Sequence, residues 1–409
     1  MMRRLSLVVL WSALLPVGLQ GQGVGTAGSA RLTLRDAVDS AMRNNVDVWI
    51  ARSVADSARA ETRIARALPN PVFSSIPNVP FQYSAALPLD IGPQRTSRAR
   101  VSDLGALAAQ SDLLDNARQV AFAARRAFLD VLLADARREI VSARRDIMRQ
   151  LVAADSARVR AGDVPERALI RSSVELLRTE TDVARAGIEA QAARLLLQGV
   201  MGVTKPDTAL QIDGDLAYRD MPSLVDGGVQ AKLEHRPDVV ASRTRESQSA
   251  AAQGLARSLA LPIPQLSFVR QFDGPFNSGH YYAFGVGVEI PVLNQYRGQR
   301  ERADASHDAA GYARRKVELQ ASREIQLATA EFRAQQALVH RYESGVLVKV
   351  EQNVEATRYA YTRGASSLLE VLDAVRAQQD VLTEYRTALH DYWVAAYALQ
   401  SALGGPVVP

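Results

Sequence analysis

Cysteine is absent from this chain of 409 residues. Its absence excludes disulfide bonds, thiolate metal sites, cysteine nucleophiles and a lipid anchor on an N-terminal cysteine. Histidine is scarce, and its five positions lie far apart: His235, His280, His307, His340 and His390. No two of them have the spacing of a metal-binding pair on one helix, so we expect no metal site and no cofactor. No motif places a nucleophile beside a base, and the sequence therefore predicts no enzyme.

Free clusters of basic residues are also missing. The formal net charge is +5, but arginines and acids are interspersed, as in Arg137-Arg138-Glu139 and Arg144-Arg145-Asp146. Such mixing is typical of solvated helix faces with charge pairs three or four residues apart. It argues against nucleic acid as a partner.

Apolar runs long enough to cross a membrane as a helix do not occur. The longest, from Leu5 to Leu19, has about 15 residues, whereas a spanning helix needs roughly 20. It follows a charged start, and the small residues Gly28-Ser29-Ala30 after it form a candidate cleavage site. We therefore favour a secretory signal peptide over 1–30 rather than a membrane anchor, and expect the mature chain, 31–409, to be exported.

Helical periodicity dominates the remaining sequence. Thr33-Leu34-Arg35-Asp36 has the pattern of a capping box and predicts the start of an amphipathic helix over about 33–68, which Pro69 ends. Further helical segments are predicted over about 97–200, 229–261 and 299–403. The first long rod, over about 97–160, has a coiled-coil-like apolar seam and would span about 90 Å at about 1.5 Å per residue.

Two stretches, over about 71–92 and about 265–291, alternate instead with the period of β-strands. Their strands have one apolar side, made in the last strand by Tyr282, Phe284, Val286 and Val288. Four such strands cannot close a barrel in one chain, and open strand edges are not tolerated in lipid. We therefore expect several copies to pair their edges in a cyclic assembly, with these side chains facing lipid. A small water-soluble sheet capped by helices is the alternative.

The chain also repeats itself. Ala67-Leu68-Pro69-Asn70-Pro71 returns as Ala260-Leu261-Pro262-Ile263-Pro264, and the glycine turn at Gly162 returns at Gly364. Each half is predicted to run through a helix, a strand pair, a very long helix, a glycine turn and a long helix. A polar connector over about 205–226 separates the halves. A duplication on this scale favours a long pseudo-symmetric tube over an enzyme pocket.

Several motifs together resemble the TolC family of outer-membrane efflux proteins over nearly all of the mature chain. They are Leu32-Thr33-Leu34-Arg35-Asp36-Ala37 at the opening, Leu87-Pro88-Leu89-Asp90-Ile91-Gly92 after the second strand, Glu234-His235-Arg236-Pro237-Asp238-Val239 in the second half, Val288-Glu289-Ile290-Pro291-Val292-Leu293-Asn294 before the second rod, and Tyr361-Thr362-Arg363-Gly364-Ala365-Ser366 at the second tip. The junction before the second rod is similar to the heavy-metal-efflux branch. Many relatives carry a lipidated cysteine, which this chain lacks.

The resemblance implies a mainly α fold with a small transmembrane β part. Four strands per protomer would close a β-barrel in a homotrimer, above an α-barrel of duplicated long-helix hairpins and a partly helical equatorial band around 205–226 and near the C-terminus. It implies a place in outer-membrane lipid with a long periplasmic portion. It also implies a passive exit duct docked to a periplasmic adaptor protein and an inner-membrane efflux pump. Since the pump and adaptor would set specificity, the cargo stays open among metal ions, drugs and peptides.

The resemblance also places Glu370 and Asp373 in a ring of carboxylates around a closed tunnel mouth. Three copies of these acids would attract cations and discourage anions. Glu370 also completes a capping box with Ser367, which is the structural alternative for that residue. Tyr361 and Arg363 precede the turn and would join neighbouring hairpins by a hydrogen bond or an ion pair, unless they form an ordinary exposed rod end.

The two turn glycines, Gly162 and Gly364, are expected to form tips on which an adaptor docks, together with Asp163. Helix capping is the alternative role for Asp163. For the whole chain, the rival to a duct is a periplasmic coiled-coil adaptor, which would have one helical hairpin flanked by small β-domains. Two hairpins and paired alternating strands favour the duct, and an exported hydrolase lacks any catalytic arrangement.

Overall fold

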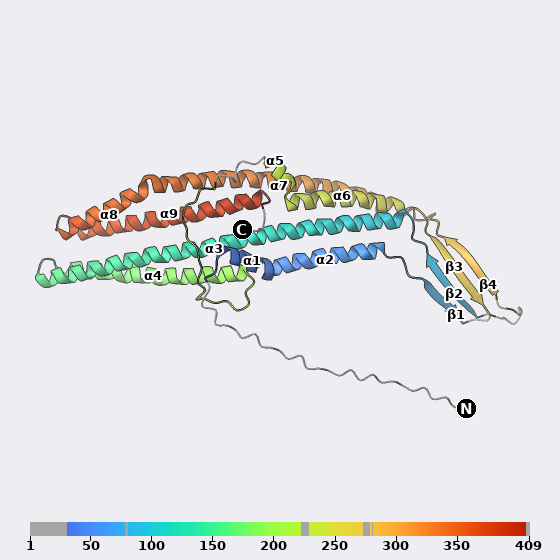
Figure 1. Ribbon diagram of the computed structural model, residues 1–409, viewed down its shortest axis with the longest axis horizontal. Helices are drawn as coiled ribbons and strands as arrows, with labels where there is room; N and C mark the ends of the chain where they lie inside the picture. The colour runs from blue at the N-terminus through green and yellow to red at the C-terminus, as the bar shows by residue number, and fades with distance from the viewer. Residues whose placement is uncertain (1–30, 78–80, 222–228, 273–278, 280, 406–409) are drawn as a thin grey trace, which may run out of the picture.

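The molecule is elongated and curved (Figure 1). A four-stranded sheet lies at one end, and the turns that connect the two helices of each hairpin lie at the other. The computed structural model describes residues 31–77, 81–221, 229–272, 279 and 281–405. The predicted signal peptide, 1–30, lies outside the described residues. Among those residues, no helix is both long and apolar enough to cross a membrane.

The order of the elements repeats once along the chain, as the duplicated sequence predicts. The first half contains α1 (Leu34–Asn44), α2 (Val46–Arg66), β1 (Val72–Ile76), β2 (Gln82–Pro88), α3 (Pro93–Ala161) and α4 (Glu166–Val200). The second half contains α5 (Val229–Glu234), α6 (Pro237–Ser258), β3 (Pro264–Gln271), β4 (Tyr281–Val288), α7 (Arg297–Arg341), η2 (Tyr342–Val346), α8 (Leu347–Thr362) and α9 (Leu368–Ala402). With 69 residues, α3 spans on the order of 100 Å.

The predicted capping box at Thr33 is confirmed, but the single helix expected over 33–68 is wrong. Asn45 is extended, with φ −67° and ψ 131°, and it separates α1 from α2. Its side-chain oxygen accepts a hydrogen bond from the backbone N–H of Asp47, and its amide donates to the carbonyl of Val200 at 2.9 Å. Asparagine competes with the helical backbone in this way, so an amphipathic pattern continues through a break that one polar side chain creates.

The second rod, expected as one very long helix before the turn at Gly364, is also interrupted. The backbone forms the π-helical turn η2 at Tyr342–Val346, and Figure 1 shows the rod bending where α7 meets α8. A π turn adds one residue to a helical turn and leaves all residues helical, so apolar periodicity alone does not reveal it.

The four strands form one antiparallel sheet in the order β1-β2-β3-β4. The register pairs Phe268 with Phe284 and Leu266 with Val286, so one side of the sheet carries aromatic and branched side chains. The other side carries mostly small and polar groups; there Ser74 and Ser84 share a hydrogen bond of 2.6 Å. Within the described residues, β1 and β4 each pair along one edge only.

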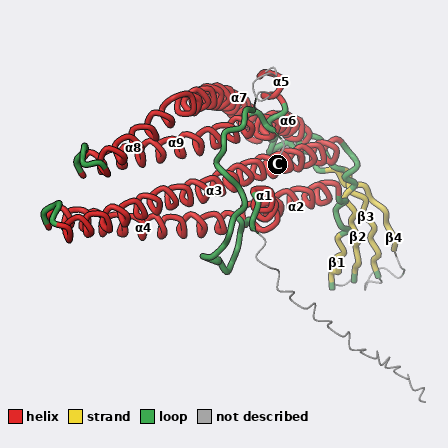
Figure 2. Tube along the Cα trace, turned by 60° about the vertical axis from the view of Figure 1, so that its left-hand side comes forward, coloured by secondary structure: helices red, strands yellow, loops and turns green. Residues whose placement is uncertain are grey.

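The helices lie side by side rather than around a central core (Figure 2). Toward the turns the order is α4, α3, α9 and α8, and toward the sheet it is α2, α3, α6 and α7. The largest apolar cluster lies at mid-length, where Phe128 of α3, Phe332 of α7 and Tyr392 of α9 are buried together. The long helix α3 therefore takes part in the packing both at the end with the turns and at the end with the sheet.

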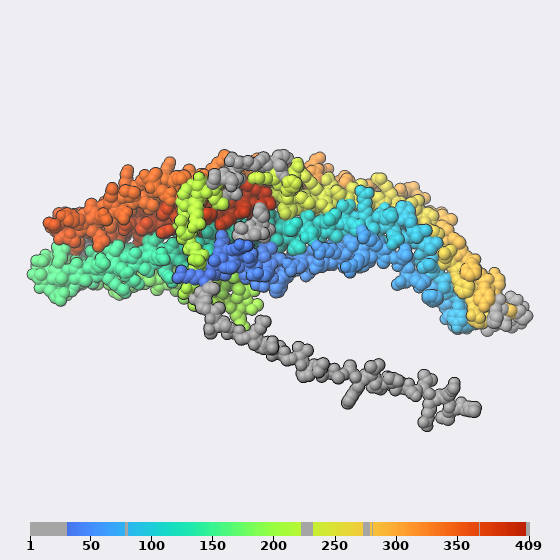
Figure 3. Space-filling view, in the orientation of Figure 1, coloured from blue at the N-terminus to red at the C-terminus, as the bar shows by residue number. Residues whose placement is uncertain are grey.

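A belt, defined as residues 205–221, crosses the helices at mid-length (Figure 3). It contains no helix among its described residues, so the helical part of the band expected around 205–226 and near the C-terminus does not lie in 205–221. The helices hold the belt by its carbonyl oxygens: the side chain of Arg194 donates to Leu210, Trp393 to Ala217 and Tyr392 to Arg219, at 2.8, 3.0 and 2.8 Å. Since these carbonyls already accept hydrogen bonds from side chains, the belt does not need helical hydrogen bonds to pair them.

A buried arginine joins three helices, α6, α7 and α9. Arg236 is 1% exposed and forms ion pairs with Asp238 at 2.7 Å and Glu324 of α7 at 2.8 Å. It also donates to the carbonyl of Ala402 at the end of α9, at 2.8 Å. Burial lowers its pKa, but the hydrogen bonds to both carboxylates outweigh burial and raise it.

We predict that Arg236→Ala lowers the free energy of unfolding by about 3–5 kcal/mol, because two carboxylates lose their cation and a cavity remains. Guanidinium unfolding followed by circular dichroism measures this change. The control is Arg219→Ala, since Arg219 forms an exposed pair with Asp215 at 3.2 Å and should contribute no more than about 1 kcal/mol. Equal midpoints for the two variants would contradict the role given to Arg236.

Candidate functional site

Both hairpins end in the same backbone turn, at the same end of the molecule (Figure 1). Gly162 and Gly364 have φ of 80° and 75°, a left-handed conformation that favours glycine. In each turn the residue after the glycine donates to the carbonyl five residues back: Asp163 to Arg158 and Ala365 to Ala360, both at 2.9 Å. The turns are exposed, so the predicted tip residues lie where a partner can reach them.

Tyr361 joins the two hairpins of one chain. Its hydroxyl donates to Oδ1 of Asp155 on α3 at 2.6 Å, and both side chains are buried. Burial and this hydrogen bond raise the pKa of Tyr361 to about 12, so the hydroxyl keeps its proton at neutral pH. The Arg158 guanidinium lies 5.3 Å from the centre of the tyrosine ring. Arg363 behaves differently, because it is exposed and lies over the ring of Tyr359 at 5.1 Å.

Glu370 and Asp373 lie one turn apart at the start of α9. The capping box predicted for Ser367 and Glu370 is present, with the Glu370 N–H donating to the serine hydroxyl at 3.3 Å. A hydrogen bond from the Ser366 hydroxyl, with a second from the Ser367 backbone, lowers the pKa of Glu370. Asp373 is 63% exposed and approaches Arg376 at 3.8 Å. The site therefore has two accessible carboxylates beside the second tip.

An ion-pair network above these acids was not found from the sequence. Oε1 of the buried Glu175 on α4 accepts hydrogen bonds from Arg144 of α3 at 2.6 Å and from Arg376 of α9 at 2.8 Å. Burial raises the pKa of Glu175, but the two arginines outweigh burial and lower it. No local pattern reveals the network, since Glu175 and Arg376 are 201 positions apart (376 − 175).

A groove of about 570 Å³ lies between α8 and α9 next to the acids. Its walls are mostly small residues, among them Ala356 and Ala360 of α8 and Ala374 and Ala377 of α9, and Glu370 and Asp373 line it. The two helices also pack directly, through Val354 of α8 and Val371 and Leu372 of α9.

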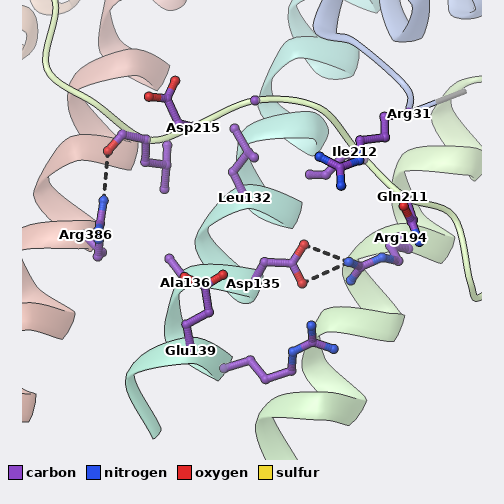
Figure 4. Close-up of a pocket in the computed structure, with 13 residues that line it drawn as sticks. Arg31, Leu132, Asp135, Ala136, Glu139, Arg194, Gln211, Ile212, Asp215 and Arg386 are labelled. Carbon is purple, nitrogen blue, oxygen red and sulfur yellow. Dashed lines mark hydrogen bonds and ion pairs between the residues drawn. The ribbon is translucent and has the colours of Figure 1, made fainter. Parts of the chain in front are cut away.

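A pocket lined by several charged residues lies under the belt and is shown in Figure 4. It has a volume of about 560 Å³ between α3, α4 and the belt. The guanidinium of Arg194 donates to both carboxylate oxygens of Asp135, at 2.9 and 2.7 Å. Arg386 donates to the carbonyl of Leu216 at 3.1 Å. These groups hold one another and the belt, and they offer no activated nucleophile. Among the described residues, no group of His, Cys, Asp and Glu is placed to bind a metal ion.

The four strand residues expected to face lipid share one side of β4. Phe284 is 85% exposed, and Tyr282, Val286 and Val288 are at least half exposed. Their partners on β3 are Arg270, Phe268, Leu266 and Pro264. An exposed apolar surface of this kind on a single chain marks a surface that something else covers.

Comparison with known proteins gives consistent results. Residues 228–405 match the family model described as outer membrane efflux protein. The cobalt-zinc-cadmium resistance protein CzcC of Cupriavidus metallidurans is 26% identical over 384 residues, which covers 91% of this chain and 90% of that protein. The fold is similar to that of the outer membrane protein VceC from Vibrio cholerae, with a TM-score of 0.78 and 18% identity over 91% of this chain and 96% of that chain. It is also similar to the open state of the MtrE outer membrane channel from Neisseria gonorrhoeae, with a TM-score of 0.76 and 17% identity over 91% and 89% of the two chains.

We predict that Tyr361→Phe loosens the contact between the two tips. The variant leaves Asp155 without its only described hydrogen-bond partner, because Oδ2 of that buried carboxylate has none either. A buried acceptor left unsatisfied costs about 1–3 kcal/mol, so amide exchange around Asp155 and Tyr361 should accelerate about tenfold or more. Tyr359→Phe is the control, since that tyrosine is exposed. Equal exchange in both variants would show that the hydrogen bond does not hold the tips.

Proposed function

We propose that this chain is an outer membrane efflux protein, the outer-membrane exit duct of a tripartite efflux system; the match of residues 228–405 to that family model supports the proposal. It conducts substrate passively from a periplasmic adaptor and an inner-membrane pump to the outside of the cell. The chain is not an enzyme. The periplasmic adaptor considered from the sequence is not supported, since this chain has two long hairpins and a four-stranded sheet.

The observation that carries the proposal is the sheet at the end of two long hairpins. One side of the sheet is apolar and exposed, and β1 and β4 have open edges within the described residues. In lipid these edges must be paired, so copies of the chain join edge to edge in a closed barrel. We propose a homotrimer, with Tyr282, Phe284, Val286 and Val288 facing the lipid of the outer membrane. The helices, on the order of 100 Å long, then extend into the periplasm as an α-barrel.

At the far end of the helices, we propose that Glu370 and Asp373 form the periplasmic gate. Symmetry would bring three copies of this acid pair around one axis, where they repel one another, attract cations and discourage anions. Tyr361 would hold the closed form through its hydrogen bond to Asp155, and Arg363 would lie at the rim of the same tip. The capping role of Glu370 is compatible with the gate, because its carboxylate remains exposed.

We expect Glu370→Ala combined with Asp373→Ala to raise the conductance of the purified duct in a planar bilayer and to weaken block by divalent cations. Without these carboxylates, the three copies no longer repel one another electrostatically, and cations are no longer attracted to the tunnel mouth. Glu351→Ala combined with Glu355→Ala is the control, because these exposed acids of α8 carry the same charge and do not line the groove that Glu370 and Asp373 line. Unchanged conductance and unchanged cation block in the Glu370 and Asp373 variant would remove both residues from the gate.

We propose that the tips at Gly162, Asp163 and Gly364 dock onto the adaptor. The system served is proposed to export divalent metal ions, because the relative CzcC is described as a cobalt-zinc-cadmium resistance protein. The metal is then cargo, and the duct needs no site that binds it tightly.

Gly364→Pro should abolish tolerance of cobalt, zinc and cadmium in cells that depend on this duct, while trimers still reach the outer membrane. Proline holds φ near −65°, whereas the tip requires 75°. Gly364→Asn is the matched control, since asparagine tolerates the left-handed conformation and should keep most of the tolerance. Full tolerance with Gly364→Pro would argue against docking at this tip. Loss of tolerance to dyes but not metals in cells without the duct would reject the proposed cargo.

A further inference from the structure

The two long rods differ at one place. In the first half α3 runs for 69 residues without a break, whereas η2 interrupts the second rod between α7 and α8. Gly345 lies in this π turn, 19 residues before the tip glycine (364 − 345). The same count before Gly162 leads to Ala143 in α3 (162 − 19). The duplicated sequence thus supplies an internal reference in which the rod has alanine and continues as an α-helix.

Two hydrogen bonds fasten the π turn to α9 in opposite directions. The hydroxyl of Tyr342 donates to Oε2 of Glu384 at 2.9 Å. The hydroxyl of Tyr385 donates to Oε1 of Glu343 at 2.9 Å, so each helix contributes one donor and one acceptor. The two tyrosine rings lie 6.1 Å apart. We call these two hydrogen bonds the latch.

Between the latch and the tip, most residues of α8 are exposed. Of its 16 residues, Val354 and Tyr361 are buried, in one apolar cluster with Val371 and Leu372 of α9, and the groove of about 570 Å³ lies beside this contact. A Cβ added at Gly345 would meet no atom within 4 Å, so the glycine is not required for close packing. What glycine supplies in that position is backbone freedom, and π turns and glycines are recognised causes of bends in helices.

We propose that η2 is a hinge, and that the latch residues Tyr342, Glu343, Glu384 and Tyr385 are positioning residues that set the angle of α8. The inference rests on the proposed gate, because α8 leads directly to the tip and its acids. When the latch is intact, α8 lies along α9 and the hydrogen bond from Tyr361 to Asp155 can form. When the latch opens, α8 turns about η2 while α3 and α4 keep their places.

The test measures the angle of α8 directly. Because the chain has no cysteine, pairs of introduced cysteines can carry spin labels without background. One pair, Glu355→Cys with Arg167→Cys, reports the distance from α8 to the first hairpin between η2 and the tips, a region called below the hinge. A second pair, Glu331→Cys with Glu189→Cys, reports the same separation on the other side of the hinge. All four positions are exposed.

Tyr342→Phe combined with Tyr385→Phe should shift the distance below the hinge, or broaden its distribution, by about 5 Å, because Glu355 lies about 15 Å beyond Gly345 along the helix and a bend of about 20° moves it by that amount. The distance on the other side should not change. Tyr359→Phe, which removes an exposed hydroxyl from α8, should leave both distances as in the parent. Glu343→Gln combined with Glu384→Gln keeps both acceptors and should also resemble the parent. Gly345→Ala should narrow the distribution, since it makes the second rod like the first.

Unchanged distances below the hinge in the double phenylalanine variant would overturn the inference. A shift of both pairs would overturn it as well, because that result means general loosening rather than a hinge. The proposed function can fail separately. If the distances respond as expected while removal of Glu370 and Asp373 leaves conductance unchanged, the hinge stands and the acid gate is wrong.

Discussion

The arrangement of this molecule depends on a sheet that one chain cannot complete. Its four strands have an apolar side facing outward and two edges without partners in the described residues. Backbone groups at such edges are costly in lipid, so the surroundings of the sheet have to come from other copies of the chain. The two long rods start from this sheet, since α3 follows β2 and α7 follows β4 after short segments. A side-by-side layer of helices, with its core spread along its length, is what a wall segment requires.

Duplication accounts for the regularity, and departures from it mark specialised places. Both tips use a left-handed glycine with the same hydrogen bonds, and both halves place a strand pair before a long rod. The halves differ where the belt crosses and where η2 interrupts the second rod. They also differ at the tips, since only the second carries the Glu370 capping box. The first hairpin is the more regular one, and the second carries the acids, the groove and the π turn.

The sequence was sufficient to predict the structure wherever the pattern involves residues close together in the chain. Alternation in β4, the capping boxes at Thr33 and Ser367, and the turns at Gly162 and Gly364 each depend on residues a few positions apart. It was insufficient where one distant partner decides the outcome. The break at Asn45 is fixed by Val200, and the place of Tyr361 is fixed by Asp155. The role of Arg376 likewise depends on Glu175, and the belt depends on side chains from several helices.

The belt has a mechanical consequence within each chain. From Gln211 to Met221 it contains neither helix nor turn, and it is fastened to α9 and, through Tyr218 and His340 at 3.1 Å, to α7, while Arg194 of α4 holds its carbonyl at Leu210. Each of these hydrogen bonds ties the belt to a different helix, so moving α4, α7 or α9 apart at mid-length requires breaking at least one of them. The belt thus acts as a cross-brace that keeps the spacing of three helices constant at that height.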